Sequence, residues 1–131
     1  MIDLVIDVSE WNPLTTKIQK EVSITTSATE KVNWLYVEGN GKIDELSINS
    51  NKDTLKLRIV IDDVVVYNES LSWIATNDAL FYNIDTSGAF IVSIRDIYFR
   101  ESFTIEYSPA EITTINLIAC RYSVRSDSIK K

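Results

Sequence analysis

An alternating segment followed by an acidic pair and a second apolar run limits the possible folds of this chain more than any other feature. Leu55, Leu57, Ile59 and Ile61 alternate with Lys56, Arg58 and Val60. A period of two predicts a strand with one face in a core and the other near water. Asp62-Asp63 separates this strand from the apolar run Val64-Val65-Val66-Tyr67. The pattern predicts a tight hairpin at the centre of an all-β domain.

Length and composition agree with one β-rich domain. The chain has 131 residues, which predicts a single domain over residues 1–131 and a core that needs no disulfide staples. Branched and aromatic side chains are abundant, and they favour strands because they pack on a pleated surface. Glycine occurs only at Gly39, Gly41 and Gly88. We therefore expect Asn, Asp and Ser to form most turns.

The rest of the chain also alternates in short segments. The expected strands are Ile2–Val8, Ile18–Thr26, Val32–Val37, Ile43–Ile48, Leu80–Ile84, Ala89–Ile94, Ser102–Tyr107 and Ile115–Val124. Between Ile43 and Leu46 the alternation slips by one, which predicts a β-bulge at Asp44-Glu45. Residues 69–78 have near-helical spacing and a capping Ser70, which predicts one short helical turn.

About eight to ten short strands with turn signals between them indicate a two-sheet β-sandwich. A jelly roll is one topology that this pattern allows. The predicted fold class is therefore an all-β, two-sheet sandwich with one short helical turn.

Charge narrows the classes of partner. The formal net charge is −6, which argues against a broad nucleic-acid surface and against an anionic membrane face. A small basic cluster at Arg121, Arg125, Lys130 and Lys131 is best interpreted as a solvated terminus. The start of the chain has acidic interruptions at Asp3 and Asp7 and does not read as a signal peptide.

No residue pattern predicts catalysis or a cofactor. Histidine is absent, which excludes His-dependent triads and His-based metal sites. Cys120 is the single cysteine and is expected to be a small buried hydrophobe. Paired carboxylates remain at Asp44-Glu45 and Asp62-Asp63. Neighbouring strand residues point to opposite faces, so such pairs are not expected to converge on a substrate or metal. We expect no enzyme, no cofactor and no metal.

The tryptophans are the best candidates for a contact surface. Trp34 lies in an alternating strand and is expected in the core or on a sheet face. Trp11 lies in a loop beside Pro13, and Trp73 lies in the predicted helical turn. Trp11 and Trp73 are therefore the predicted interface or ligand contacts. Packing against another subunit is favoured over stacking on a sugar ring.

Two segments resemble β-sandwich structural proteins of tailed viruses. Residues Gly41–Ser70 read GKIDELSINSNKDTLKLRIVIDDVVVYNES, and Ile94–Ile105 read IRDIYFRESFTI. In the proteins that they resemble, the hairpin turn is usually Asp-Gly, where this chain has Asp62-Asp63. The resemblance covers about half of the chain, contains no catalytic residue and implies a virion subunit of the tail, baseplate or capsid decoration.

The leading hypothesis is a non-enzymatic structural subunit of a virus particle that assembles as a homo-oligomer. Closed symmetry is the common case for such modules, and a trimer is the first expectation. The expected partners are further copies of the chain and other virion proteins, with contacts through the loop tryptophans and Met1–Lys20. The alternative is a carbohydrate-binding sandwich that uses Trp11 or Trp73. A hydrolase would need Asp44, Asp62 and Asp63 to converge on a cleft.

Overall fold

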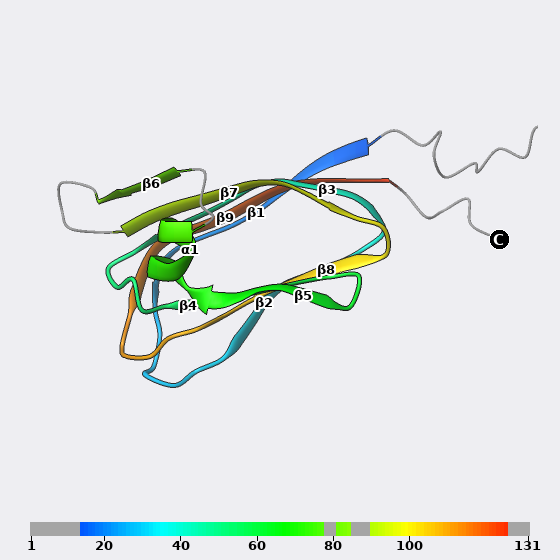
Figure 1. The fold of residues 1–131 in the computed structure, drawn as a ribbon. Coiled ribbons are helices and arrows are strands. Elements are labelled where there is room, and N and C mark those ends of the chain that lie inside the picture. Colours follow the sequence, from blue (N-terminus) through cyan, green and yellow to red (C-terminus); the bar gives the residue numbers. More distant parts are fainter. Residues whose placement is uncertain (1–13, 78–80, 85–89, 126–131) are drawn as a thin grey trace, which may run out of the picture.

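The computed structural model describes residues 14–77, 81–84 and 90–125 (Figure 1). The predicted first strand Ile2–Val8 and the candidate contact Trp11 lie outside the described residues. The described part of the chain forms these elements: β1 (Leu14–Thr25), β2 (Val32–Glu38), β3 (Asn40–Ser50), β4 (Lys56–Ile61), β5 (Val64–Ser70), α1 (Leu71–Asn77), β6 (Phe81–Ile84), β7 (Phe90–Phe99), β8 (Ser102–Ser108) and β9 (Thr114–Arg125).

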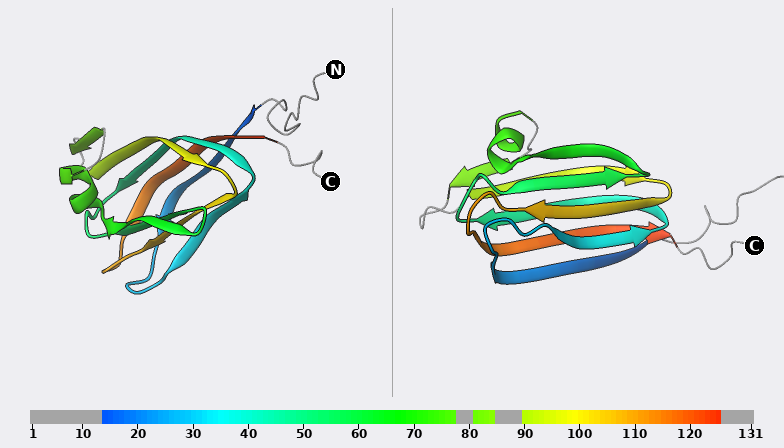
Figure 2. Two further views of the ribbon diagram at one scale, coloured as in Figure 1. Left: turned by 45° about the vertical axis from the view of Figure 1, so that its right-hand side comes forward. Right: turned by 90° about the horizontal axis from the view of Figure 1, so that it is seen from below.

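The strands form two antiparallel sheets that face each other, as the two layers in Figures 1 and 2 show. The five-stranded sheet has the order β1-β9-β3-β7-β6, and the four-stranded sheet has the order β2-β8-β4-β5. The prediction of an all-β, two-sheet sandwich with one short helical turn is therefore confirmed.

The pairings identify the topology as a jelly roll. Strands far apart in sequence pair as β1 with β9, β2 with β8 and β3 with β7, and β4 pairs with its neighbour β5. The chain therefore runs out through β1 to β4 and returns through β5 to β9, so that the two halves pair antiparallel like the arms of one long hairpin. The short strand β6 lies outside this pattern and pairs with β7 at the edge of the sheet. Rolling up that hairpin also brings β9 against β3 and β8 against β4. The result is two sheets in the double-sheet arrangement of a jelly roll.

The core lies between the sheets and follows from the alternation. In β4 the side chains of Leu57, Ile59 and Ile61 are buried, and Lys56 is exposed on the other face. The inner face of the five-stranded sheet is also apolar and packs against these side chains. The buried hydrophobic side chains are Trp34, Ile43, Leu46, Ile48, Leu55, Leu57, Ile59, Ile61, Leu71, Ile74, Val92, Ile94, Phe99, Phe103, Ile105, Tyr107, Ile115, Ile118 and Cys120.

The ladders of the described strands shift register at four places, and the sequence predicted one of these shifts. The register between β3 and β9 shifts between Ile43 and Glu45, which confirms the bulge at Asp44-Glu45. A second shift lies between Asn33 and Leu35, so Trp34 is the extra residue of β2. Because of this bulge, Leu35 turns toward the core. Tyr36, two residues after the buried Trp34, is 54% exposed, so strict alternation does not continue through the bulge.

The hairpin turn between β4 and β5 has the predicted position. Asp62 and Asp63 have φ values of 50° and 66°, and positive φ at both central residues is the mark of a type I′ turn. Such a turn matches the right-handed twist of the two strands that it joins. The acidic pair therefore serves turn geometry.

Asp62 also holds a second turn, which connects β7 to β8. Its carboxylate accepts hydrogen bonds from the backbone N–H groups of Arg100, Glu101 and Ser102, and the bond from Glu101 is 2.7 Å long. In return the Asp62 N–H donates to the Ser102 carbonyl at 2.9 Å. Burial by itself would raise the pKa of Asp62, but the three backbone donors outweigh it and lower that pKa.

The helix α1 follows β5 directly and closes one end of the sandwich (Figure 1). The Ser70 hydroxyl accepts a hydrogen bond from the Trp73 N–H at 3.2 Å, so Ser70 is the predicted N-cap. Leu71 and Ile74 are fully buried and anchor the helix to the core. Within the described residues no helix is long and apolar enough to cross a membrane.

Replacing Asp62 by Ala should destabilise the fold by about 1–3 kcal/mol, because three backbone donors lose a charged acceptor. The matched control is Asp63→Asn, which keeps a residue that tolerates positive φ and should change stability by less than about 0.5 kcal/mol. Urea unfolding at pH 7 measures both variants. An Asp62→Ala midpoint equal to that of the wild type would contradict the role of this carboxylate.

The same contact predicts a pH dependence. Because the pKa of Asp62 is lowered in the folded state, its stabilisation is present above the ordinary aspartate pKa and is lost as the pH falls through the lowered value. The stability difference between wild type and Asp62→Ala should therefore shrink between pH 7 and about pH 3. A difference that stays constant over this range would argue against an ionised Asp62.

Candidate functional site

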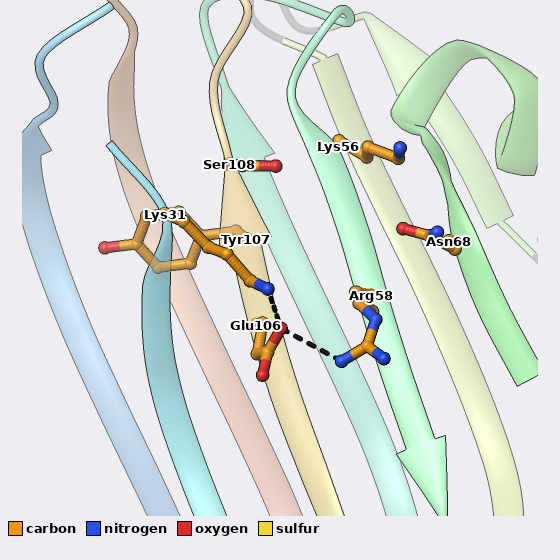
Figure 3. Close-up of a pocket in the computed structure, with 7 residues that line it drawn as sticks. All are labelled: Lys31, Lys56, Arg58, Asn68, Glu106, Tyr107 and Ser108. Carbon is orange, nitrogen blue, oxygen red and sulfur yellow. Dashed lines mark hydrogen bonds and ion pairs between the residues drawn. The ribbon is translucent and has the colours of Figure 1, made fainter. Parts of the chain in front are cut away.

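A polar hollow lies on the outer face of the four-stranded sheet. It has a volume of about 250 Å³. Strands β4, β5 and β8 and the loop before β2 supply its lining, which consists of Lys31, Lys56, Arg58, Asn68, Glu106, Tyr107 and Ser108 (Figure 3). Lys56 and Arg58 of β4, Asn68 of β5 and Glu106 of β8 are polar side chains that border the hollow.

Glu106 organises the charges in this hollow. Its Oε1 atom lies 3.4 Å from Lys31 Nζ and 3.2 Å from Arg58 Nη1 (Figure 3). The Glu106 side chain is only 13% exposed, so both cations are held over a carboxylate that is largely covered. With Lys56 added, the lining has three cations and one anion. The hollow is thus locally positive on an acidic protein.

The chemistry of this lining favours small polar or anionic groups over stacked sugar rings. Ammonium, guanidinium, amide and hydroxyl groups supply the hydrogen-bonding capacity. The aromatic residue in the lining, Tyr107, is 3% exposed and therefore offers no open ring face. Sequence reasoning missed this hollow, because Arg58 and Glu106 are opposite each other only through the pairing of β4 with β8. The sequence did show that both residues occupy polar, outward-facing positions of predicted strands, and this was the signal that could have suggested a polar surface site.

The predicted tryptophan contacts do not gather at one place in the described structure. Trp73 lies on α1 and is 43% exposed. Trp34 is buried, as expected for a core position, and its Nε1 atom donates to Glu21 Oε1 of β1 at 2.6 Å. Trp11 lies outside the described residues. Trp73 is therefore the described tryptophan with a surface that a partner or ligand can reach.

The carboxylate pair Asp44-Glu45 does share one face, contrary to the expectation for neighbouring strand residues. The bulge cancels the alternation, so both side chains find partners on the outer face of the five-stranded sheet. Asp44 accepts from the Ser123 hydroxyl at 2.7 Å, and Glu45 accepts from the Ser93 hydroxyl at 2.7 Å.

The contacts of this pair tie strands together. Glu45 Oε2 lies 3.4 Å from Arg95 Nη2, and its Oε1 lies 3.9 Å from Arg121 Nη2. The hydrogen bond from Ser93 and the two guanidinium groups lower the pKa of Glu45. Asp62 has separate partners in the β7–β8 turn. In the described part of the chain, no group of three or more His, Cys, Asp or Glu residues is placed to hold a metal ion.

Arg121 and Arg125, the two described residues of the basic cluster, lie in β9 of the five-stranded sheet. Arg121 lies near Glu45, and Arg125 Nη1 donates to Asn40 Oδ1 at 2.7 Å. Their interpretation as part of a solvated terminus was wrong, because β9 continues to Arg125 in the middle of the strand order. Lys130 and Lys131 lie outside the described residues.

Apolar side chains are exposed on strands at the edges of both sheets. In β1 these are Leu14, Ile18 and Val22, and in β5 they are Val64, Val65 and Val66. Among the described strands, β1 pairs with β9 alone, and β5 pairs with β4 alone. Exposed apolar groups beside unpaired strand edges are a common feature of association surfaces.

Comparisons with known proteins do not place the chain in a family. No protein-family model and no curated protein matches it. Among solved structures, it is similar to the crystal structure of dimeric latent PorU from Porphyromonas gingivalis, with 5% identity and a TM-score of 0.45. The match covers 86% of this chain and 13% of that one. A similarity at this level carries no argument about function.

Cys120 should be inert toward thiol reagents in the folded protein. It is fully buried and free, as predicted for a small hydrophobe. Burial, with a smaller contribution from the charge of Asp44, raises the pKa of its thiol to about 12. Because the thiolate is the reactive form, labelling at pH 8 should be at least about 100-fold slower than in urea. Rapid native labelling would contradict this burial.

Proposed function

We propose that this chain is a non-enzymatic structural subunit of a virus particle, as a capsid, decoration or tail component, and that it assembles as a homo-oligomer. Two lines of support come together here. One is the jelly-roll sandwich, an architecture that viral capsid domains use. The other is the resemblance of residues 41–70 and 94–105 to β-sandwich proteins of tailed viruses.

The observation that carries the proposal is the exposure of apolar side chains on strand edges. Ile18 of β1 is 66% exposed and Val64 of β5 is 61% exposed. A monomeric protein usually blunts such edges, because they expose both backbone hydrogen-bonding groups and apolar area. Contact with further copies or with other virion proteins covers both. The edges therefore support an assembly role.

The described carboxylates support a non-enzymatic reading. Asp44 and Glu45 bind side chains of neighbouring strands, and Asp62 binds backbone donors of a turn. These contacts explain the carboxylates without a substrate. The predicted trimer, and a location in the virion, stay predictions.

A gradient experiment tests the virion assignment. In a lysate of the cells that make this chain, the protein should sediment with virus particles, while a soluble host marker stays in the light fractions. The purified chain should be larger than a monomer in light scattering at high concentration. A strict monomer found only in the light fractions would contradict the proposal.

Carbohydrate binding is a second candidate function because of one observation, the 43% exposure of Trp73 on α1. Ser70, which caps this helix, is the β5 residue opposite Lys56, and Lys56 lines the polar hollow. The helix that carries Trp73 therefore begins next to the strand that supplies Lys56 to the hollow. This candidate does not require self-assembly.

A glycan array tests the second candidate. Binding should fall by about 2- to 13-fold in Trp73→Ala, because a contact on an aromatic face contributes about 0.5–1.5 kcal/mol. The control is Tyr98→Ala, which removes an aromatic side chain that is 70% exposed on β7. A blank array for the wild type, or equal loss in both variants, would count against carbohydrate binding at Trp73.

A further inference from the structure

We propose that the free edges of strand β1 from two copies of this chain pair in antiparallel fashion, about a two-fold axis at Ile18. The two five-stranded sheets would then join into one continuous sheet across the pair. The inference rests on the self-assembly in the proposed function and names the surface that mediates it. It does not depend on the virus particle as the setting.

Strand β1 offers the longest free edge among the described strands. It has 12 residues, whereas the other edge strands β2 and β5 have 7 each and β6 has 4. Every β1 residue except Gln19 and Ile24 is exposed. A strand of this length that pairs on one side alone presents a row of backbone donors and acceptors to a further strand.

An apolar stripe runs along one face of this edge. Leu14, Ile18 and Val22 are 45%, 66% and 57% exposed. Ile18 lies opposite Arg121 of β9 in the ladder, and residues directly opposite share a face. Arg121 contacts Glu45 on the outer face of the five-stranded sheet, so the stripe lies on that outer face.

One antiparallel register makes this stripe complementary to itself. With Ile18 on the two-fold axis, it lies opposite Ile18 of the second copy, and Leu14 lies opposite Val22. Each apolar residue of the stripe then gains an apolar cross-strand neighbour. Directly opposite Cβ atoms in such a ladder are about 4.5–5.5 Å apart, which is close enough for these side chains to pack.

The opposite face of β1 fits the same register. Lys17 lies opposite Gln19 of the second copy and diagonal to its Glu21. A diagonal neighbour is about 7–8 Å away, within reach of a lysine side chain. Glu21 accepts the Trp34 indole N–H through Oε1, which leaves Oε2 for the lysine. Lysines on an edge strand normally oppose pairing, but in this register Lys17 meets an acceptor. Lys20, on the face of the apolar stripe, lies opposite Thr16 of the second copy.

Neighbouring registers are less favourable. A shift that places Gln19 on the axis puts Lys17 directly opposite Glu21, but it also sets Ile18 against Lys20. A pairing shifted by a single residue puts the apolar stripe against the polar face. The backbone sets the limit of the pairing, because Ser23 has a φ of 56° and drops out of the ladder with β9. Regular pairing therefore covers Leu14 to Val22.

The pairing predicts an even number of copies in the assembly. Alone it gives two copies, and combined with a three-fold contact on another surface it gives six. Ile18→Lys should halve the molar mass measured by light scattering, because like charges would face each other across the axis. The matched control is Ile112→Lys, which changes an isoleucine of almost equal exposure, 64%, in the loop between β8 and β9.

A second variant reports on the geometry. Ile18→Cys places two thiols across the axis, and mild oxidation should give a covalent pair of chains that a reducing agent separates. Ile112→Cys should give none, and the buried Cys120 does not compete. Urea unfolding checks that all variants fold, since both isoleucines are exposed.

The outcomes separate this inference from the proposed function. An oligomer with an odd number of copies, or one whose mass is unchanged in Ile18→Lys, would overturn the β1 pairing and leave self-assembly intact. So would the absence of a covalent pair in Ile18→Cys. A wild-type chain that is monomeric at high concentration would overturn both.

Discussion

Burial of one face of each sheet is the constraint on which the rest of this structure depends. Leu57, Ile59 and Ile61 of β4 face the interior, and Ile43, Leu46 and Ile48 of β3 do the same from the opposite sheet. A strand with one apolar face is stable only when that face meets another apolar layer. The long hairpin therefore rolls up, and rolling brings β9 beside β3 and β8 beside β4.

The rolled hairpin also explains where polar groups are used. At one end, the Asp62 carboxylate joins the β4–β5 turn to the β7–β8 turn through backbone donors. On the outer face of the five-stranded sheet, a bulge turns Asp44 and Glu45 toward serine and arginine side chains of β7 and β9. These carboxylates are engaged in contacts within the fold. The proposed role in association rests instead on the apolar side chains that are exposed on the edge strands β1 and β5.

Particular residues show how far sequence reasoning reached. The alternation around Leu57, the acidic turn at Asp62, the slip at Asp44-Glu45 and the cap at Ser70 were all predicted, because each depends on neighbours within a few residues. The bulge at Trp34 was missed, because both alternations of β2 look equally good until β8 selects one. The polar hollow was missed for the same reason, since Arg58 and Glu106 are 48 residues apart and meet only through strand pairing.

The sequence by itself determined that this chain is a β-sandwich that contains the β4–β5 hairpin, because hydrophobic periodicity and turn chemistry are local properties. That β5 lies at the edge of its sheet was not determined by the sequence. It also determined that this chain contributes no histidine side chain. Only the tertiary structure decided which strands lie at the edges. Leu14, Ile18 and Val22 are apolar residues at even spacing, and this pattern by itself does not show whether a strand face is buried or exposed. They are exposed because they lie on the outer face of the five-stranded sheet and β1 is an edge strand among the described strands. The order of strands depends on contacts between distant parts of the chain.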